Sequence, residues 1–166
     1  MARRPLEGIR VADFTWVWAG PFCTLQLAHL GAEVIRIETA TRPCITRLLP
    51  PWPDSQPGLN RSGYFNQYNQ GKRSLTLNLK EPEALEIAKR LVTKSDIVTE
   101  NFAGGVMDRL GLGYDVLKQI KPDLIVTQDL CHVCAASPDD LASALTRLST
   151  MLSFTFGCRR STAAML

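Results

Sequence analysis

The chain has 166 residues, which is enough for one domain with a hydrophobic core. Its formal net charge of +3 is small and its basic residues are dispersed, which argues against binding to nucleic acid or to an anionic membrane surface. No apolar run approaches the roughly 20 residues that a membrane-spanning helix needs, and no apolar signal segment stands at the start. We therefore expect a globular, cytoplasmic protein.

The first 38 residues have the pattern of a strand–helix–strand unit. Residues 9–14 alternate and are β-branched at their centre, which indicates a strand. Pro21 suits the first turn of a helix, because its missing N–H would have no partner there. Helical spacing follows in 22–30, Gly31 stands in the usual position of a left-handed cap, and 33–38 is a second strand. Such a unit implies parallel strands with a right-handed crossover.

The pattern continues after a proline-rich loop over residues 39–62. We predict further strands at 74–79, 97–100 and 124–127, and helices at 81–94, 104–110 and 114–120. The fold class is therefore α/β, a Rossmann-like parallel sheet flanked by helices. Ligands of such folds bind beyond the carboxyl ends of the strands, which here means residues 15–20 and the stretch after Glu38.

The amino-acid composition changes after Thr127, where glycine and aromatic residues become rare and small residues dominate. We therefore predict a ligand-binding Rossmann-like portion at 1–127 and a divergent tail at 128–166, with one helix at 139–152.

The five cysteines do not suggest a disulfide framework, because their number is odd and their spacing is uneven. Cys131 and Cys134 form a CxxC pair around His132. A structural zinc site needs about four ligands, and no second pair follows. We therefore predict no metal site and interpret the pair as two half-buried thiols.

Four stretches of the chain occur together in one protein family. They are residues 5–11 (PLEGIRV) leading into Ala19-Gly20-Pro21, 30–38 (LGAEVIRIE), 69–75 (NQGKRSL), and 100–102 (ENF) continuing to 108–111 (DRLG). In this order and at this spacing they resemble the family III CoA-transferases, the CaiB/BaiF group that includes carnitine and formyl-CoA transferases. One stretch alone would be a weak signal, whereas the four together are specific.

The resemblance implies a Rossmann-like large domain, of which this chain would be an incomplete N-terminal part. It also implies a homodimer whose two subunits are threaded through each other as interlocked rings. Members move CoA between carboxylic acids, through an aspartate that forms a mixed anhydride and then a thioester. Acyl-CoA and carboxylic acids would therefore be the substrates, with no permanently bound cofactor. A related branch racemises α-methylacyl-CoA thioesters.

Carried over position by position, the resemblance implies CoA contacts at four points of the chain. The corresponding residues are Trp18, Ala19, Leu77, Asn78, Leu79, Lys80, Asn101, Phe102, Ala103 and Arg109. Lys80 and Arg109 can meet the phosphates of CoA, the lysine as a point charge and the arginine as a bidentate fork. Trp18 offers an apolar platform near the thioester, and the turn at 101–103 precedes a helix N-terminus, which favours anions.

Two positions depart from the family pattern. Thr39 stands where an arginine often lies against the adenine, so we expect the adenine contact to weaken or to move to Arg42 or Arg47. The family nucleophile is an aspartate in a Gly-Asp context, and no Gly-Asp pair occurs before Leu166. We therefore assign no catalytic residue and predict an inactive or partial chain.

Several alternatives stay open. The chain could be part of an α-methylacyl-CoA racemase-like enzyme, a non-catalytic CoA-binding remnant, or a domain that works only with a partner chain. A generic dinucleotide-binding domain is disfavoured, because the first turn lacks the GxGxxG pattern.

Two sequence features also have simple structural interpretations. We interpret the Lys72-Arg73 pair as mainly structural, anchoring its loop through hydrogen bonds to backbone carbonyls. Trp16 and Trp18 are two residues apart at a strand end, so we expect them to face the same side.

Overall fold

The computed structural model describes residues 3–128, and everything below concerns that part of the chain. In chain order its elements are β1 Arg10–Asp13, α1 Ala19–His29, β2 Glu33–Glu38, the 3-10 turns η1 Ile45–Leu48 and η2 Pro53–Ser55, α2 Gly63–Tyr68, β3 Arg73–Thr76, α3 Pro82–Thr93, β4 Ile97–Glu100, α4 Val106–Arg109, α5 Tyr114–Ile120 and β5 Ile125–Gln128.

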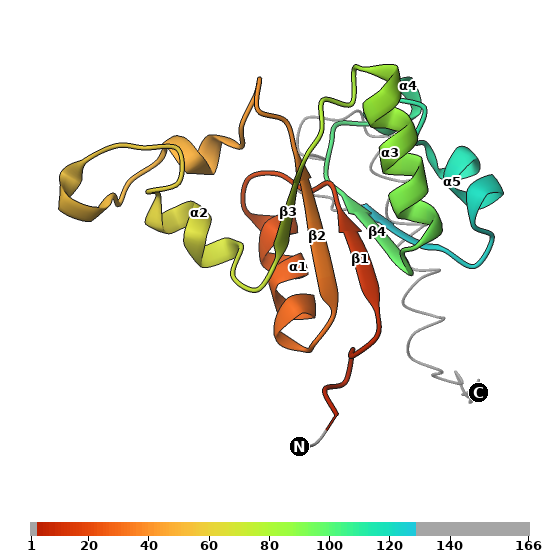
Figure 1. Ribbon diagram of the computed structural model, residues 1–166, viewed down its shortest axis with the longest axis horizontal. Helices are drawn as coiled ribbons and strands as arrows, with labels where there is room; N and C mark the ends of the chain where they lie inside the picture. Colours follow the sequence, from red (N-terminus) through yellow and green to blue (C-terminus); the bar gives the residue numbers. More distant parts are fainter. Residues whose placement is uncertain (1–2, 129–166) are drawn as a thin grey trace, which may run out of the picture. The chain divides into compact units, whose positions relative to one another are not determined.

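The five described strands form one parallel sheet in the order β3-β2-β1-β4-β5. Helix α1 covers one face of the sheet, and α3 and α5 cover the other (Figure 1). This strand order is the Rossmann order, and it confirms the predicted α/β fold class. The order reverses between β1 and β4, so the crevice expected to hold a ligand lies beyond the carboxyl ends of these two strands.

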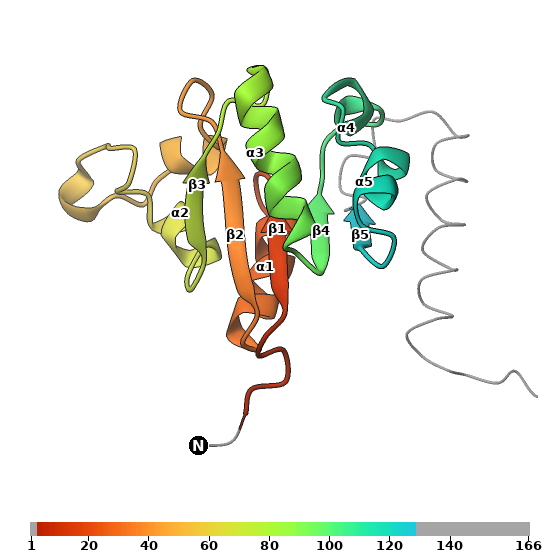
Figure 2. The same cartoon turned by 45° about the vertical axis from the view of Figure 1, so that its right-hand side comes forward.

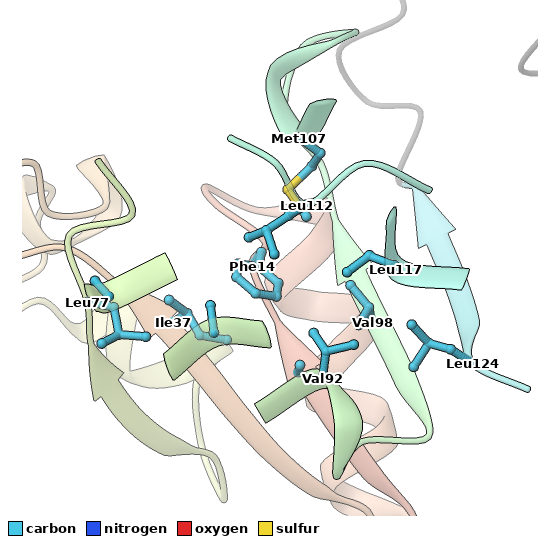
Figure 3. Close-up of a cluster of buried hydrophobic side chains, with 12 residues drawn as sticks. Phe14, Ile37, Leu77, Val92, Val98, Met107, Leu112, Leu117 and Leu124 are labelled. Carbon is cyan, nitrogen blue, oxygen red and sulfur yellow. The ribbon is translucent and has the colours of Figure 1, made fainter. Parts of the chain in front are cut away.

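The larger core lies between the sheet and helices α3 and α5. Helix α3 turns one stripe toward it, with Ala84, Ala88 and Val92 buried, and begins with Pro82 at a position that needs no N–H. Figure 3 shows the apolar side chains from sheet and helices that meet there. The labelled members are Phe14, Ile37, Leu77, Val92, Val98, Met107, Leu112, Leu117 and Leu124.

The face of the sheet under α1 changes character along the strands. Val11 and Val34 pack there with Ala28 and Ala32 in a small apolar cluster near the strand beginnings. Toward the carboxyl ends the buried side chains are charged, namely Asp13, Arg36 and Glu38. The polar end of this face therefore lies at the edge where the ligand site is expected.

The structure corrects three predicted elements. Residues 63–68 form helix α2, for which no element was predicted, and the strand predicted at 74–79 is β3, which ends at Thr76. The helix predicted at 104–110 is the single turn α4. At the sheet edge, Arg73 is exposed and forms an ion pair with Glu33 at 3.0 Å.

Gln128, the first residue of the predicted tail, ends β5, whereas the rest of the tail, its helix and the Cys131–Cys134 pair lie outside the described residues. The boundary at residue 127 stays a prediction. Within residues 3–128 no helix is both long enough and apolar enough to cross a bilayer. The same part of the chain contains no cluster of three metal-ligating side chains.

Candidate functional site

The turn after β1 is built around the buried carboxylate of Asp13. Thr15 donates its N–H to Asp13 Oδ1 at 2.9 Å and its hydroxyl to the same atom at 2.5 Å. The hydroxyl of Thr24 donates to Oδ2 at 2.7 Å. A Cβ atom added to Gly20 would lie 2.5 Å from the Cβ of Thr15, so only glycine fits there. The chain therefore turns tightly from β1 into α1.

The ammonium group of Lys72 links this turn to the segment before β3. Its Nζ lies within 3.2 Å of four acceptors: Pro21 O, Thr24 Oγ1, Asn69 Oδ1 and Asp13 Oδ2. Burial lowers the pKa of Lys72 to about 8, against the attraction of the Asp13 carboxylate. The bond to Pro21 O confirms the predicted anchoring role for Lys72, whereas Arg73 pairs with the Glu33 carboxylate. The pairing with Asp13 was missed, because a charged residue that ends an apolar strand was its only sequence signal.

Asn101 joins the end of β4 to the same turn. Its Oδ1 accepts the N–H of Trp16 and its Nδ2 donates to Trp16 O, both at 2.7 Å. Asn101 is only 3% exposed. The structure therefore places this predicted contact inside the turn, with both side-chain polar atoms bonded to the main chain.

The expectation that Trp16 and Trp18 face the same side is wrong, because the residue between them is not extended. Val17 has a φ of 67°. The ring of Trp16 lies 6.3 Å from the ring of Phe102, whereas Trp18 stacks on Tyr64 at 5.6 Å. The two indoles therefore contact different elements.

Four aromatic rings form a surface group between the beginning of α1 and helix α2. Trp18 stacks on Tyr64, Tyr64 lies 5.5 Å from Tyr68, and the ring of Phe22 meets Tyr68 edge-on at 6.1 Å. Trp18 is 49% exposed and Phe22 is 51% exposed. Neighbouring Ala19 is half-buried in the first turn of α1. The group offers an apolar surface at the carboxyl edge of the sheet.

An open hollow of about 360 Å³ lies where the beginning of α3 meets α4. Figure 2 shows both elements at the edge to which the strand arrowheads point. The lining residues are Leu79, Lys80, Glu81, Pro82, Leu85, Arg109 and Leu110. Lys80 and Arg109 are both exposed, and neither forms an ion pair within residues 3–128. The structure thus brings three predicted positions, Leu79, Lys80 and Arg109, into one basic hollow.

Two further predicted CoA contacts, Leu77 and Asn78, make contacts within the protein. Leu77 is 8% exposed and belongs to the core. Asn78 supports the turn into α3, since its Oδ1 accepts the Lys80 N–H at 3.4 Å and its Nδ2 donates to Glu81 at 3.2 Å. Neither of these two side chains lines the hollow.

The turn at 101–103 precedes a helix that begins later and is shorter than the sequence predicted. The Phe102 N–H donates to the Glu100 carboxylate at 2.7 Å, and Ala103 is exposed. Helix α4 has four residues and follows Gly105 in the left-handed region, with φ 72°. One helical turn sums too few peptide dipoles to favour an anion strongly, so the argument from a helix N-terminus fails here.

Arg42 and Arg47, which could replace the missing adenine contact, differ in the bonds that they make within the protein. Arg47 donates to both carboxylate oxygens of Glu38, at 2.8 and 3.0 Å, and to Asn60 at 2.7 Å. Burial alone would raise the pKa of Glu38, but bonds from Arg47 and from a backbone N–H lower it overall. Arg42 is exposed, and its guanidinium lies 5.8 Å from the ring of Trp16. Arg42 is therefore the better placed of the two to meet a ligand.

Together, the parallel strands and their order define the class of the fold, a Rossmann-like α/β domain, in which the edge that carries the basic hollow is where a ligand is expected. Comparison with known sequences narrows this class to one family. The profile of CoA-transferase family III matches residues 6–130, and the chain belongs to that family.

The relatives of this chain include proteins named as CoA-transferases. The chain is 42% identical over 120 residues to a succinyl-CoA:mesaconate CoA-transferase of Haloarcula marismortui, covering 72% of this chain and 30% of that protein. It is 41% identical over 124 residues to a formyl-CoA:oxalate CoA-transferase of Afipia carboxidovorans, covering 74% and 28%. A solved CAIB/BAIF family protein from Brucella suis matches with a TM-score of 0.69 and 35% identity, over 76% and 33%. The chain thus spans about 30% of the length of the curated relatives it matches.

Proposed function

We propose that residues 3–128 form the CoA-binding portion of a family III CoA-transferase that moves CoA between carboxylic acids. The observation that supports this best is the shared hollow of Lys80 and Arg109 at the ligand-binding edge of the sheet. The relatives act on acyl-CoA donors such as succinyl-CoA and formyl-CoA, which supports an acyl-CoA and a carboxylic acid as the substrates.

In this proposal, the nucleotide end of CoA binds at the hollow. Lys80 supplies a compact charge and Arg109 a planar fork, and both side chains are free to meet phosphate oxygens. Leu79 lines the same hollow and contributes apolar contact. Arg42 above the Trp16 ring takes the place of the adenine contact that Thr39 cannot make. Trp18 and Tyr64 offer their stacked surface to the pantetheine and acyl end.

Binding energy from the nucleotide end would hold the thioester in place for acyl exchange. The nucleophile is assigned to none of the described residues. Asp13 cannot serve, because it is fully buried and its oxygens accept hydrogen bonds from Thr15, Thr24 and Lys72. We therefore propose that this chain binds CoA without turning it over.

Titration calorimetry with CoA and with pantetheine, which lacks the nucleotide, tests the binding site. Lys80→Ala and Arg109→Ala should each lose about tenfold in CoA affinity, the size of a lost hydrogen bond to a charged group. Pantetheine binding should not change in either variant. Lys94→Ala and Arg90→Ala, exposed positions near the other end of α3, are the matched controls. Equal losses in the controls would contradict the assignment.

A transferase assay with succinyl-CoA and a panel of carboxylic acids tests the missing nucleophile. The expected result is CoA binding without turnover by the 166-residue chain. Turnover would show that the chain supplies a nucleophile and would overturn that part of the proposal. Light scattering after size-exclusion chromatography tests whether this chain forms a homodimer.

A further inference from the structure

A β-branched residue in the left-handed region stands at the centre of the ligand-binding edge. Val17 has a φ of 67°, a conformation that β-branched residues avoid on steric grounds. Such a conformation persists only where the surroundings impose it, and it is found preferentially at functional sites.

Two side chains hold the peptide group that joins Trp16 to Val17. Asn101 accepts the Trp16 N–H and donates to Trp16 O, both at 2.7 Å, so its amide acts as one more rung of the β1–β4 ladder. The N–H of Val17 itself donates to Cys44 Sγ at 3.3 Å. Asn101 is 3% exposed and Cys44 is fully buried, which keeps water from competing for these bonds.

The kink at Val17 separates two aromatic rings that an extended strand would place on one side. The Trp16 ring contacts Phe102 and Arg42, at 6.3 and 5.8 Å. The Trp18 ring stacks on Tyr64 with an interplanar angle of 27°. The crevice therefore presents one indole beside Arg42 and the other beside α2.

We propose that Asn101 is a positioning residue, which locks Val17 in the left-handed conformation and thereby directs Trp18 onto Tyr64. Asn101 acts on a ligand through this turn and does not touch it. Cys44, in the loop after β2, supports the same conformation by accepting the Val17 N–H. The effect on CoA affinity rests on the proposed function, whereas the effect on Trp18 does not.

The first test measures the stacked Trp18–Tyr64 pair by near-ultraviolet circular dichroism. Each variant is compared with the same variant carrying Trp18→Phe, so that the difference spectrum reports Trp18 alone. Asn101→Ala should lose most of this difference signal. Asparagine adopts the left-handed region more readily than valine, so adding Val17→Asn should restore the signal. Gln119→Ala, an exposed amide on α5, is the control and should leave it unchanged.

The second test measures CoA affinity in the same variants. Asn101→Ala should lose about tenfold through lost preorganisation, and the double variant with Val17→Asn should regain most of the loss. A loss of affinity with an unchanged Trp18 signal would mean that Asn101 touches the ligand directly, and would overturn the inference. So would a double variant that restores neither property.

If Asn101→Ala does not fold, Cys44 decides the question. Cys44→Ala removes the acceptor of the Val17 N–H and should weaken the Trp18 signal, whereas Cys44→Ser keeps an acceptor and should retain it. Equal signals in these two variants overturn the inference. If the unaltered chain binds no CoA, the proposed function fails, and the circular dichroism measurements still decide the role of Asn101.

Discussion

Lys72 is buried among four acceptors, so its protonation is coupled to folding. The pKa of Lys72 is lowered from 10.5 to about 8 by burial, although the Asp13 carboxylate opposes the shift and Arg36 adds to it. The unfolded chain holds this proton up to about pH 10.5, whereas the folded chain releases it near 8. Between these values the unfolded state binds more protons, and stability therefore rises with pH.

Lys72→Met isolates this effect, because methionine keeps the length of the side chain and does not titrate. The free energy of unfolding of the unaltered chain, minus that of the variant, should increase between pH 8 and 10.5. The slope should not exceed about 1.4 kcal/mol per pH unit. Urea denaturation at several pH values measures it. A difference that stays flat or falls would contradict the lowered pKa.

In the sequence, Arg42 and Arg47 were equivalent candidates for the adenine contact. Their surroundings in the structure predict different effects of substitution. Arg42→Ala should weaken CoA binding about three- to tenfold through a lost cation–π or stacking contact, without loss of stability. Arg47→Ala should instead lower stability by about 3 kcal/mol, because it removes two hydrogen bonds to the buried Glu38 carboxylate and leaves it only the longer ion pair with Arg36. Calorimetry with CoA and thermal unfolding of both variants test this contrast. The reverse pattern would contradict it.

At the scale of elements, helix α2 depends on one buried hydroxyl. Ser62 accepts the Phe65 N–H at 3.2 Å as the N-cap, and its hydroxyl lies 2.6 Å from Thr46 O. Ser62→Ala should lower the free energy of unfolding by about 1–2 kcal/mol, as for other lost caps. Ser74→Ala, at an exposed position of β3, is the control and should have little effect. Chemical denaturation measures both.

Most elements could be predicted from periodicity alone, whereas α2 could not. Strands β2 and β4 and helix α5 have the predicted bounds, because apolar spacing and flanking glycine or proline determine them locally. Helix α2 has only six residues and is stabilised by contacts across the sequence. Those contacts include the guanidinium of Arg47 at 3.6 Å from the Phe65 ring. Such tertiary contacts leave no periodic signal in a short segment.

The candidate site also combines residues that could be predicted from the sequence with residues that could not. The resemblance led to Leu79, Lys80 and Arg109, which share a hollow because their segments follow parallel strands of one sheet. It gave no sign that Asn101 is buried in the turn. The Val17 conformation and the Asp13–Lys72 pair depend on groups that are 27 to 85 residues apart in sequence, and no local pattern encodes them.

At the scale of the whole molecule, we predict that the β5 edge of the described sheet takes part in self-association. Within the described residues β5 pairs with β4 alone, and Ile125 on this strand is 51% exposed. An open apolar edge strand can pair with another copy. Ile125→Lys should therefore reduce concentration-dependent association in sedimentation velocity. Val116→Lys, on the exposed side of α5, is the control, and an equal reduction there would exclude the edge as the cause.

The change from apolar to charged residues along β1 and β2 helps to set the register between the two strands. Val11 is paired with Val34 and Asp13 with Arg36. A slip of two residues would keep every side chain on its own face, so the hydrophobic pattern alone does not forbid it. It would, however, set the Asp13 carboxylate against Val34 and move it away from the Lys72 ammonium group, at a cost of several kcal/mol. The buried charged side chains at the carboxyl end of the sheet therefore determine the register between β1 and β2, which apolar packing alone does not determine.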